Sequence, residues 1–379
     1  PAWASPDQPY PSPVTSTGGP VRVSTAPTAC LSVSDAVEKD RAILRRTARR
    51  RRAGRAMSEV LVVRPSSLGD VVWALAVARD VATARPGTAV DWVVETPFAA
   101  LPAMCADVRR SVPIALRTWR RRPFAASTWR AMRAFRAELR RERYDAVLDL
   151  QEQVKGAVVA KLARGPRHGP DRASIREPVA TWLHDVHHAI DPAQHFATRA
   201  RALAAAELGY AAAGPPRWRW NVPPAPSGTP DRPYALVAHV TSRPDKRWPD
   251  ERWRALVGDL DAAGFEVLLP HGNDDEEARS RALAAGIARA SVPPRLALRD
   301  MAGLIARAHV VAGVDTGLTH LAAALGVPTL ALFTTTDATL AGVAIAGEHA
   351  RDLGGNGTMP TLDDARAALG ELLRRAPRC

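Results

Sequence analysis

The sequence predicts an α/β fold built from two parallel, doubly wound sheets. Strand-like and helix-like segments alternate along most of the chain after residue 57, the strand-like segments are compact apolar runs, and a Pro-rich stretch without periodicity divides the series in two. The length of 379 residues and the hydrophobic content of 46% are sufficient for two such domains. We therefore expect two facing Rossmann-like domains with a cleft between them.

Changes in composition set the expected domain boundaries. Residues 1–56 are first polar and Pro-rich and then basic, whereas Met57 begins a pattern typical of a folded domain. We expect residues 1–56 to be a disordered or non-native basic extension, with a true basic arm as the alternative. The remaining chain is divided into an N-terminal Rossmann-like domain at 57–210, a linker at 211–232, a C-terminal Rossmann-like domain at 233–360 and a C-terminal helix at 361–379.

The order of the expected elements supports this division. In the first half we expect strands at Val60–Arg64, Asp91–Glu95, Val112–Leu116 and Ala146–Leu150, and helices at Val71–Ala84, Thr128–Arg143, from Val154, and at Gln194–Glu207. In the second half we expect strands at Ala235–His239, Glu266–Leu269, His309–Ala312 and Thr329–Phe333, and helices at Asp250–Ala263, from Asp274, at Arg299–Ala308, Thr319–Leu325 and Thr361–Leu373. Ligands of such sheets bind beyond the carboxyl ends of the strands.

The net charge of +13 comes from two local features. Residues 1–56 hold ten Lys and Arg against four acids, and residues 109–143 hold twelve Arg against two Glu. In the second segment Arg117, Arg120 and Arg121 are expected in a loop, where guanidinium groups suit an anionic acceptor or an anionic membrane surface. Nucleic acid is the alternative partner of such a patch.

The three cysteines are scattered, at Cys30, Cys105 and Cys379. They indicate neither a disulfide framework nor a metal quartet, and they favour a reducing, cytoplasmic location. His184, His187, His188 and His195 cluster in the sequence but without metal-site spacing.

The stretch VDTGLTH, at 314–320, follows an expected strand of the second half. Its amide groups open a helix, and such a terminus suits a phosphate or diphosphate. Gly317 allows close approach of an anion, and Thr316 can cap the helix or donate a hydroxyl. Asp315 is expected to bond sugar hydroxyls beside the phosphate. The alternative is a helix cap with His320 facing the core.

The stretch HVTSRPDKRWP, at 239–249, follows another strand of the same half. Thr241 and Ser242 are placed to bond a phosphate, and Lys246 can neutralise it as a point charge. The alternative is an ordinary polar loop before a helix.

The stretch RPSSLGD, at 64–70, follows the first strand of the chain and lacks the Gly-rich dinucleotide fingerprint. Asp70 is expected to open the helix that follows. It either complements the helix dipole or accepts a proton from an attacking hydroxyl, and the two roles are compatible.

Taken together, these stretches resemble the bacterial lipopolysaccharide heptosyltransferases, which are inverting glycosyltransferases with the two-domain GT-B fold. The resemblance rests on SSLGD, DWVVE, YDAVLDLQ, RHG…REP, HVTSRPDKRWP and VDTGLTHLAAALGVP, which occur in this order between residues 57 and 333. DKRWP and DWVVE favour the members that add the first heptose. Pro244 and the run Phe333-Thr334-Thr335 depart from the family pattern.

The resemblance implies ADP-heptose as donor and the Kdo residue of Kdo2-lipid A as acceptor, at the cytoplasmic face of the inner membrane. It implies Asp70 as general base and Lys246 as the residue that stabilises the leaving ADP. The donor set would be Thr241, Ser242, Lys246, Glu276, Asp315, Thr316, Gly317 and His320, and the acceptor set Ser66, Ser67, Arg117, Arg120 and Arg121. We expect no metal and no other cofactor, because Lys246 and a helix N-terminus can stabilise a departing diphosphate.

Three other hypotheses remain open from the sequence. A transferase that adds the second heptose, or another ADP-sugar transferase of this fold, would use the same loops. A catalytically silent sensor would bind ADP-heptose without turnover. A basic nucleic-acid-binding protein would use the arginine runs but would leave both strand-end loops without a purpose, so we expect no nucleic acid as partner.

Overall fold

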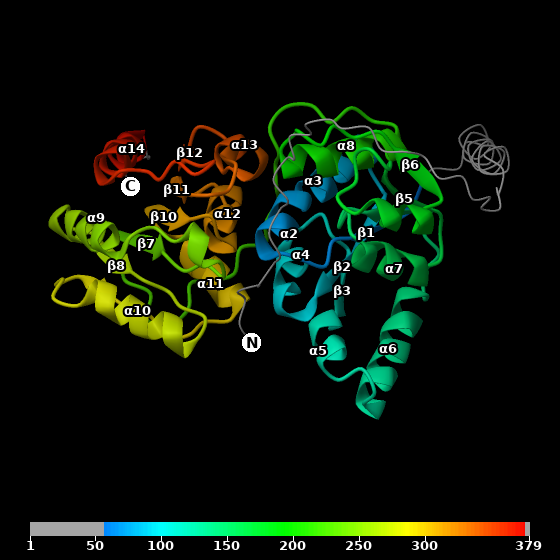
Figure 1. The fold of residues 1–379 in the computed structure, drawn as a ribbon, viewed down its shortest axis with the longest axis horizontal. Coiled ribbons are helices and arrows are strands. Elements are labelled where there is room, and N and C mark those ends of the chain that lie inside the picture. The colour runs from blue at the N-terminus through cyan, green and yellow to red at the C-terminus, as the bar shows by residue number, and fades with distance from the viewer. Residues whose placement is uncertain (1–56, 376–379) are drawn as a thin grey trace, which may run out of the picture. The chain divides into compact units, whose positions relative to one another are not determined.

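A computed structural model describes residues 57–375, which form two six-stranded parallel sheets joined by a linker (Figure 1). We call residues 57–210 the N-terminal lobe and residues 233–375 the C-terminal lobe. The predicted α/β class with parallel sheets is confirmed. The expectations for residues 1–56 lie outside the described residues, and the domain boundaries remain a prediction.

The sheet of the N-terminal lobe has the order β3-β2-β1-β4-β5-β6. Its strands are β1 (Glu59–Val63), β2 (Ala89–Glu95), β3 (Arg110–Ile114), β4 (Ala146–Asp149), β5 (Arg167–Pro170) and β6 (Val186–His188). Its helices are α2 (Leu68–Ala74), α3 (Ala76–Ala84), α4 (Ala100–Met104), α5 (Leu116–Arg121), α6 (Ala126–Leu139), α7 (Val154–Leu162) and α8 (Phe196–Leu208), with the 3₁₀ turns η1 (Thr96–Phe98) and η2 (Pro178–Leu183).

The sheet of the C-terminal lobe has the order β12-β11-β10-β7-β8-β9. Its strands are β7 (Tyr234–Ala238), β8 (Glu266–Leu268), β9 (Ala290–Ser291), β10 (Val310–Val314), β11 (Thr329–Phe333) and β12 (Ala350–Gly354). Its helices are α9 (Asp250–Ala262), α10 (Asp274–Ala284), α11 (Leu298–Ile305), α12 (Gly317–Ala324), α13 (Ala338–Ala341) and α14 (Leu362–Arg375), with the 3₁₀ turns η3 (Pro244–Lys246) and η4 (Ala344–Ala346).

The central strands of the two sheets carry apolar side chains on both faces, because helices cover both faces of each parallel sheet. In β1, Val60 and Val62 belong to one apolar cluster, while Leu61 and Val63 belong to another on the opposite face. The cluster of Val60 continues into the C-terminal lobe and includes Leu236 and Leu321. The two lobes therefore share one apolar core on the sides where α2 and α12 pack together.

The strand orders place two topological switch points. Chain connections leave in opposite directions on either side of the β1–β4 pair in the first sheet and of the β7–β10 pair in the second. A crevice opens outside the carboxyl ends of strands at such a point, and ligands bind there. RPSSLGD follows β1, HVTSRPDKRWP follows β7 and VDTGLTH follows β10, so all three stretches lie at switch points.

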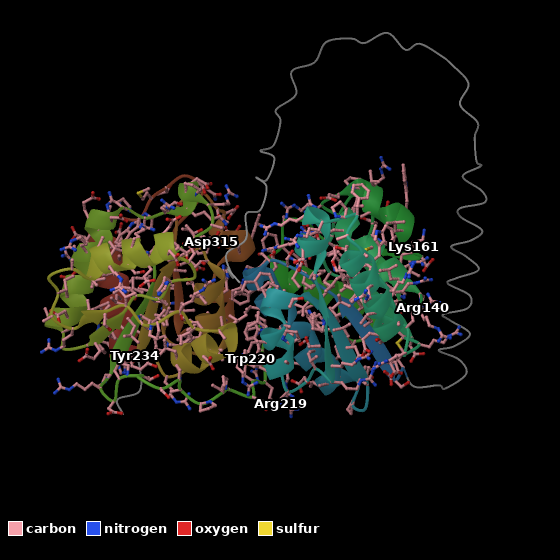
Figure 2. All side chains as sticks on the ribbon, turned by 90° about the horizontal axis from the view of Figure 1, so that it is seen from below. Arg140, Lys161, Arg219, Trp220, Tyr234 and Asp315 are labelled. Atoms are coloured by element: carbon pink, nitrogen blue, oxygen red, sulfur yellow. The ribbon has the colours of Figure 1, made fainter. Side chains whose placement is uncertain are left out.

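The linker is hydrogen-bonded to both lobes. The indole N–H of Trp218 donates to the carbonyl of Val72 in α2 over 2.8 Å, and that of Trp220 donates to the carbonyl of Ala324 at the end of α12 over 2.9 Å (Trp220 is labelled in Figure 2). Through these two tryptophans the linker contacts both lobes.

Several sequence expectations differ from the structure. The strand expected at Val112–Leu116 is β3, which ends at Ile114, and the segment with Arg117, Arg120 and Arg121 is the helix α5 instead of a loop. The helix expected at Val71–Ala84 begins at Leu68 and divides into α2 and α3. Strands β5, β6, β9 and β12 were not expected, because their short and partly polar sequences carry little strand signal.

The helix expected at Thr128–Arg143 is α6, which ends at Leu139. Phe135 and Leu139 are buried, whereas Trp129 and Met132 of the same helix are 52% and 38% exposed. No helix within residues 57–375 is long and apolar enough to span a membrane.

Candidate active site

Asp315 is the centre of the C-terminal part of the site. It follows β10, and its carboxylate accepts from Nζ of Lys246 over 2.7 Å and pairs with Nε2 of His320 over 3.0 Å (Asp315 is labelled in Figure 2). Burial favours the neutral acid, but the hydrogen bond from His320 and the charge of Lys246 outweigh it and hold the pKa of Asp315 far below its usual range. Asp315 is therefore an anion that orients two donors.

His320 connects this centre to the N-terminal lobe. Its Nδ1 accepts from the indole Nε1–H of Trp73 over 2.7 Å. Because an indole nitrogen only donates, Nδ1 carries no proton, and Nε2–H is left to donate to Asp315. The sequence left open whether His320 faces the core or a ligand. The buried ring bridges Trp73 of α2 and Asp315 of the loop before α12.

Lys246 ends the 3₁₀ turn η3 in the loop after β7. The neighbouring Asp245 is fixed from β11: Oγ1 of Thr334 donates to its carbonyl over 2.7 Å, and Oγ1 of Thr335 donates to its carboxylate over 3.0 Å. These threonines are the residues that depart from the family pattern. In this chain they tie the Lys246 loop to the end of β11, which lies beyond β10 from β7 in the sheet.

The other expected donor residues have local roles in the structure. Glu276 lies in the first turn of α10: its Oε2 accepts from the amide of Gly272 over 2.7 Å, and its amide donates to Oδ1 of the N-cap residue Asn273 over 2.9 Å. Thr241 is buried and Ser242 is exposed, both in the loop of Lys246. No contact with a ligand tests these residues, so their donor roles remain predictions.

Two glycines allow the lobes to approach closely. A Cβ on Gly317 of α12 would lie 2.2 Å from Cδ2 of Leu68, and a Cβ on Gly69 of α2 would lie 2.9 Å from the ring of His320. We expected Gly317 to make room for an anion. The structure shows a second reason for a glycine at position 317: Leu68 occupies the space where a Cβ would lie. Thr316 is the N-cap residue of α12 but makes no capping hydrogen bond through its side chain.

Asp70 lies in the first turn of α2, one turn before Trp73. Its Oδ2 accepts from the amide and the hydroxyl of Ser67 over 3.0 Å and 2.9 Å, and its Oδ1 pairs with Arg64 over 2.9 Å. Burial raises its pKa, but the charge of Arg64 and the bonds from Ser67 outweigh this and lower the pKa below its usual value. Asp70 is therefore ionised, and Arg64 moderates its basicity.

Ser66 is held by residues that the sequence analysis did not assign to the site. Its amide donates to Oε1 of Gln151 over 3.1 Å, and Nζ of Lys155 donates to its hydroxyl over 3.2 Å. The backbone amide of Gln151 donates in turn to Oδ1 of Asp149. The carboxylate of Asp149 pairs with the buried His184 over 2.9 Å. The motif YDAVLDLQ contained this signal, because two polar residues follow an apolar strand end.

The arginines expected to bind the acceptor differ in their exposure to solvent. Arg120 and Arg121 are exposed on α5. Arg117 is half-buried, with its guanidinium 5.6 Å from the centroid of the Phe98 ring and its amide donating to Oε1 of Glu95. Burial raises the pKa of Glu95, although the amide and charge of Arg117 and the charge of Lys155 oppose this. Arg117 and Lys155 are therefore near one carboxylate, while the exposed pair faces solvent.

Comparison with known proteins identifies the family. The sequence profile of the family described as "Glycosyltransferase family 9 (heptosyltransferase)" matches residues 132–362. Lipopolysaccharide heptosyltransferase 1 of Escherichia coli (strain K12) is 41% identical over 289 residues, which cover 75% of this chain and 90% of that protein. The chain belongs to glycosyltransferase family 9, the heptosyltransferases. Lipopolysaccharide heptosyltransferase 1 of Pseudomonas aeruginosa is 39% identical to this heptosyltransferase over 278 residues, or 72% of this chain and 78% of that one.

Solved structures extend the likeness to the fold. The E. coli heptosyltransferase WaaC with ADP superposes on this heptosyltransferase with a TM-score of 0.76 at 36% identity, covering 83% of this chain and 99% of WaaC. WaaC with ADP-2-deoxy-2-fluoro heptose gives a TM-score of 0.73. E. coli ADP-heptose LPS heptosyltransferase II gives 0.65 at 20% identity and shares the fold. The predicted GT-B architecture and the assignment as a glycosyltransferase are confirmed.

Proposed function

We propose that this heptosyltransferase transfers heptose from ADP-heptose to the Kdo residue of Kdo2-lipid A, the first heptose addition to the inner core. Two comparisons support the proposal: lipopolysaccharide heptosyltransferase 1 of Escherichia coli (strain K12) is 41% identical to this chain over 90% of its own length, and WaaC has been solved with ADP and with ADP-2-deoxy-2-fluoro heptose. The chain of contacts Lys246–Asp315–His320–Trp73 is the observation that carries it, because it joins the expected diphosphate-binding loop to the helix that holds Asp70.

The donor would bind at the switch point of the C-terminal sheet. Lys246 pairs with Asp315 over 2.7 Å. A diphosphate carries more negative charge than one carboxylate, so it would draw Lys246 toward itself and leave Asp315 to accept from the sugar hydroxyls. Thr241, Ser242 and Thr316 would add hydroxyl donors, and Glu276 would bond the ribose.

The transfer would be a single displacement. Asp70 would accept the proton of the acceptor hydroxyl, the resulting oxygen would attack the anomeric carbon, and the bond to the diphosphate would break with inversion at that carbon. Lys246 and the N-terminus of α12 would stabilise the leaving ADP. On this proposal the charge of Lys246 takes the place of a catalytic metal.

The acceptor would bind along the N-terminal lobe and would contact Ser66, Ser67 and Arg117 as its hydroxyl reaches Asp70. Helices α5 and α6 extend beyond the sheet in Figure 1, and between them Phe124 is 93% exposed. Phe124, Trp129 and Met132 lie within the arginine-rich segment that includes Arg120 and Arg121. Exposed apolar side chains among cations suit an anionic membrane surface. We place the enzyme peripherally on the cytoplasmic face of the inner membrane.

The deciding experiment follows ADP release with two acceptors, Kdo2-lipid A and the same lipid already carrying its first heptose. We expect turnover only with the heptose-free acceptor. Turnover only with the heptose-bearing lipid would identify a second-heptose enzyme. Binding of ADP-heptose without ADP release from either acceptor would identify a sensor and contradict the proposal.

A further inference from the structure

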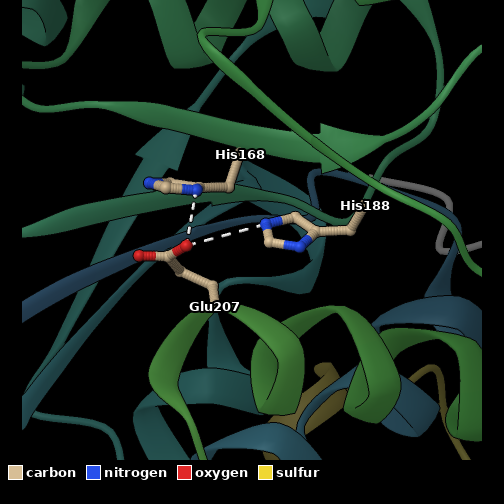
Figure 3. A group of neighbouring side chains, drawn as sticks. All are labelled: His168, His188 and Glu207. Carbon is tan, nitrogen blue, oxygen red and sulfur yellow. Dashed lines mark ion pairs between the residues drawn. The ribbon is translucent and has the colours of Figure 1, made fainter. Parts of the chain in front are cut away.

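Two histidines and one glutamate converge between helix α8 and the β5–β6 side of the N-terminal sheet (Figure 3). Nδ1 of His168 lies 2.9 Å from Oε2 of Glu207, and Nε2 of His188 lies 3.6 Å from the same oxygen. One ligand atom from each residue lies within 4.8 Å of the others. These residues belong to neither the donor set nor the acceptor set.

The fold explains why residues so far apart in sequence meet. In the β5–β6 ladder His168 pairs with Val186, and Pro170 pairs with His188. Residues two apart share a face of a strand, so both histidines point to the same side of the sheet. Helix α8 covers that side and supplies Glu207 from its last turn. Three regular elements therefore fix the three side chains.

The group is buried and its nitrogens are poorly satisfied by protein. The side chains of His168 and Glu207 are 1% and 3% exposed, and that of His188 is 15% exposed. Within the described residues, Nε2 of His168 has no hydrogen-bond partner, and the ion pairs of His168 Nδ1 and His188 Nε2 with Glu207 lack hydrogen-bond geometry. Buried polar atoms of this kind need a partner. A metal cation bound by the nitrogen lone pairs would provide one.

We propose that His168, His188 and Glu207 bind a divalent transition-metal ion of the Zn²⁺ class. Zn²⁺ takes imidazole and carboxylate ligands at about 2.0–2.2 Å, which separates tetrahedral ligand atoms by about 3.3 Å. The observed separations of 2.9 Å and 3.6 Å lie on either side of this value. Three protein ligands leave the fourth position to water. The ion links β5, β6 and α8, and it takes no part in the sugar transfer.

The test uses the full chain without a histidine tag, dialysed against chelator and then titrated with Zn²⁺ in competition with a chromophoric chelator. We expect one tightly bound Zn²⁺ per chain and a rise in the melting temperature of several degrees. Glu207→Gln should weaken the affinity at least about tenfold and remove that rise. Co²⁺ at the same site should give the visible absorption of a tetrahedral complex.

Two further variants keep the proposal falsifiable if Glu207→Gln fails to fold. His188→Gln alters the most exposed ligand and should also weaken the affinity at least about tenfold. His187→Gln is the matched control, since His187 is the next residue of β6, and its Nε2 bonds the carbonyl of Thr181. Failure of the wild-type chain to bind Zn²⁺, or equal binding by wild type and His188→Gln, would refute the site. So would equal loss of binding in His187→Gln.

Discussion

The indole N–H of Trp73 donates to Nδ1 of His320 across 2.7 Å, and this bond joins helix α2 to helix α12. Asp70 precedes Trp73 by one turn of α2, and His320 donates to Asp315. One hydrogen-bonded chain therefore runs from the helix of the proposed base to the loop of the proposed donor. Trp73 fixes the tautomer of His320 in this chain, because the indole can only donate.

Replacement of Trp73 by Phe should loosen this connection while retaining much of the packing. The buried Nδ1 of His320 would lose its donor, at a cost of about 1–3 kcal/mol in the free energy of unfolding. The orientation of His320 toward Asp315 would also weaken, so we expect the KM for ADP-heptose to rise about tenfold. Denaturant unfolding and steady-state kinetics measure the two effects.

Trp253→Phe is the control for packing. Trp253 is fully buried like Trp73, but its Nε1 has no hydrogen-bond partner within residues 57–375. Its replacement should lower stability through lost contacts and leave the KM for ADP-heptose unchanged. An equal rise in KM in both variants would mean that the bond to His320 has no specific role.

Lys246→Met removes the charge expected to face the diphosphate and keeps the length of the side chain. We expect kcat to fall by about 10²–10³, because the charge developing on ADP would be less well stabilised. The buried carboxylate of Asp315 would also lose an ion-pair partner, so stability should fall. Lys161→Met is the control, since Lys161 is exposed in the last turn of α7. A wild-type kcat in Lys246→Met would exclude the proposed role.

Arg64→Met should change the pH dependence of transfer. Arg64 lowers the pKa of Asp70, so its removal raises that pKa and moves the acidic limb of kcat/KM toward higher pH. Between about pH 5 and pH 8 the wild type should show little loss from protonation of this base, whereas the variant should lose activity at the lower end. Asp70→Asn should lower kcat by about 10²–10⁴ across the range. An unshifted acidic limb in Arg64→Met would argue against Asp70 as the base.

The exposed arginines offer a test of acceptor binding. Arg120→Gln combined with Arg121→Gln should raise the KM for Kdo2-lipid A severalfold, because exposed charges attract an anionic lipid through weak, salt-dependent contacts. ADP affinity, measured by calorimetry, should remain unchanged. Arg299→Gln, an exposed change on α11 of the other lobe, is the control. Equal loss of acceptor and ADP binding would contradict the division between the lobes.

The sequence predicted the parallel sheets and the strand-end loops because both leave local signals. Apolar runs mark β1, β7, β10 and β11, and polar residues follow each of these strands. The last two strands on one side of the N-terminal sheet left weak signals: β5 reads RHGP and β6 reads VHH, so neither shows an apolar run. Periodicity alone does not detect such strands, because neighbouring strands of the sheet stabilise them.

The contacts within the site were less accessible to sequence reasoning. Asp315 and Lys246 were assigned from their loops, but the bond between Trp73 and His320 joins residues 247 positions apart. Trp73 reads as an ordinary apolar residue of a helix. Likewise, His168 and His188 reach Glu207 only through strand register and the position of α8. The spacing of residues along the chain carries no information about such long-range contacts.

The paired glycines Gly69 and Gly317 affect how mutational surveys of this enzyme should be interpreted. Each one receives a side chain of the opposite lobe, His320 or Leu68, so even alanine at either position would force α2 and α12 apart. An inactive Gly317→Ala enzyme would thus report a displaced helix as readily as a lost phosphate contact. A compensating truncation at Leu68, by restoring activity to that variant, would distinguish the two causes.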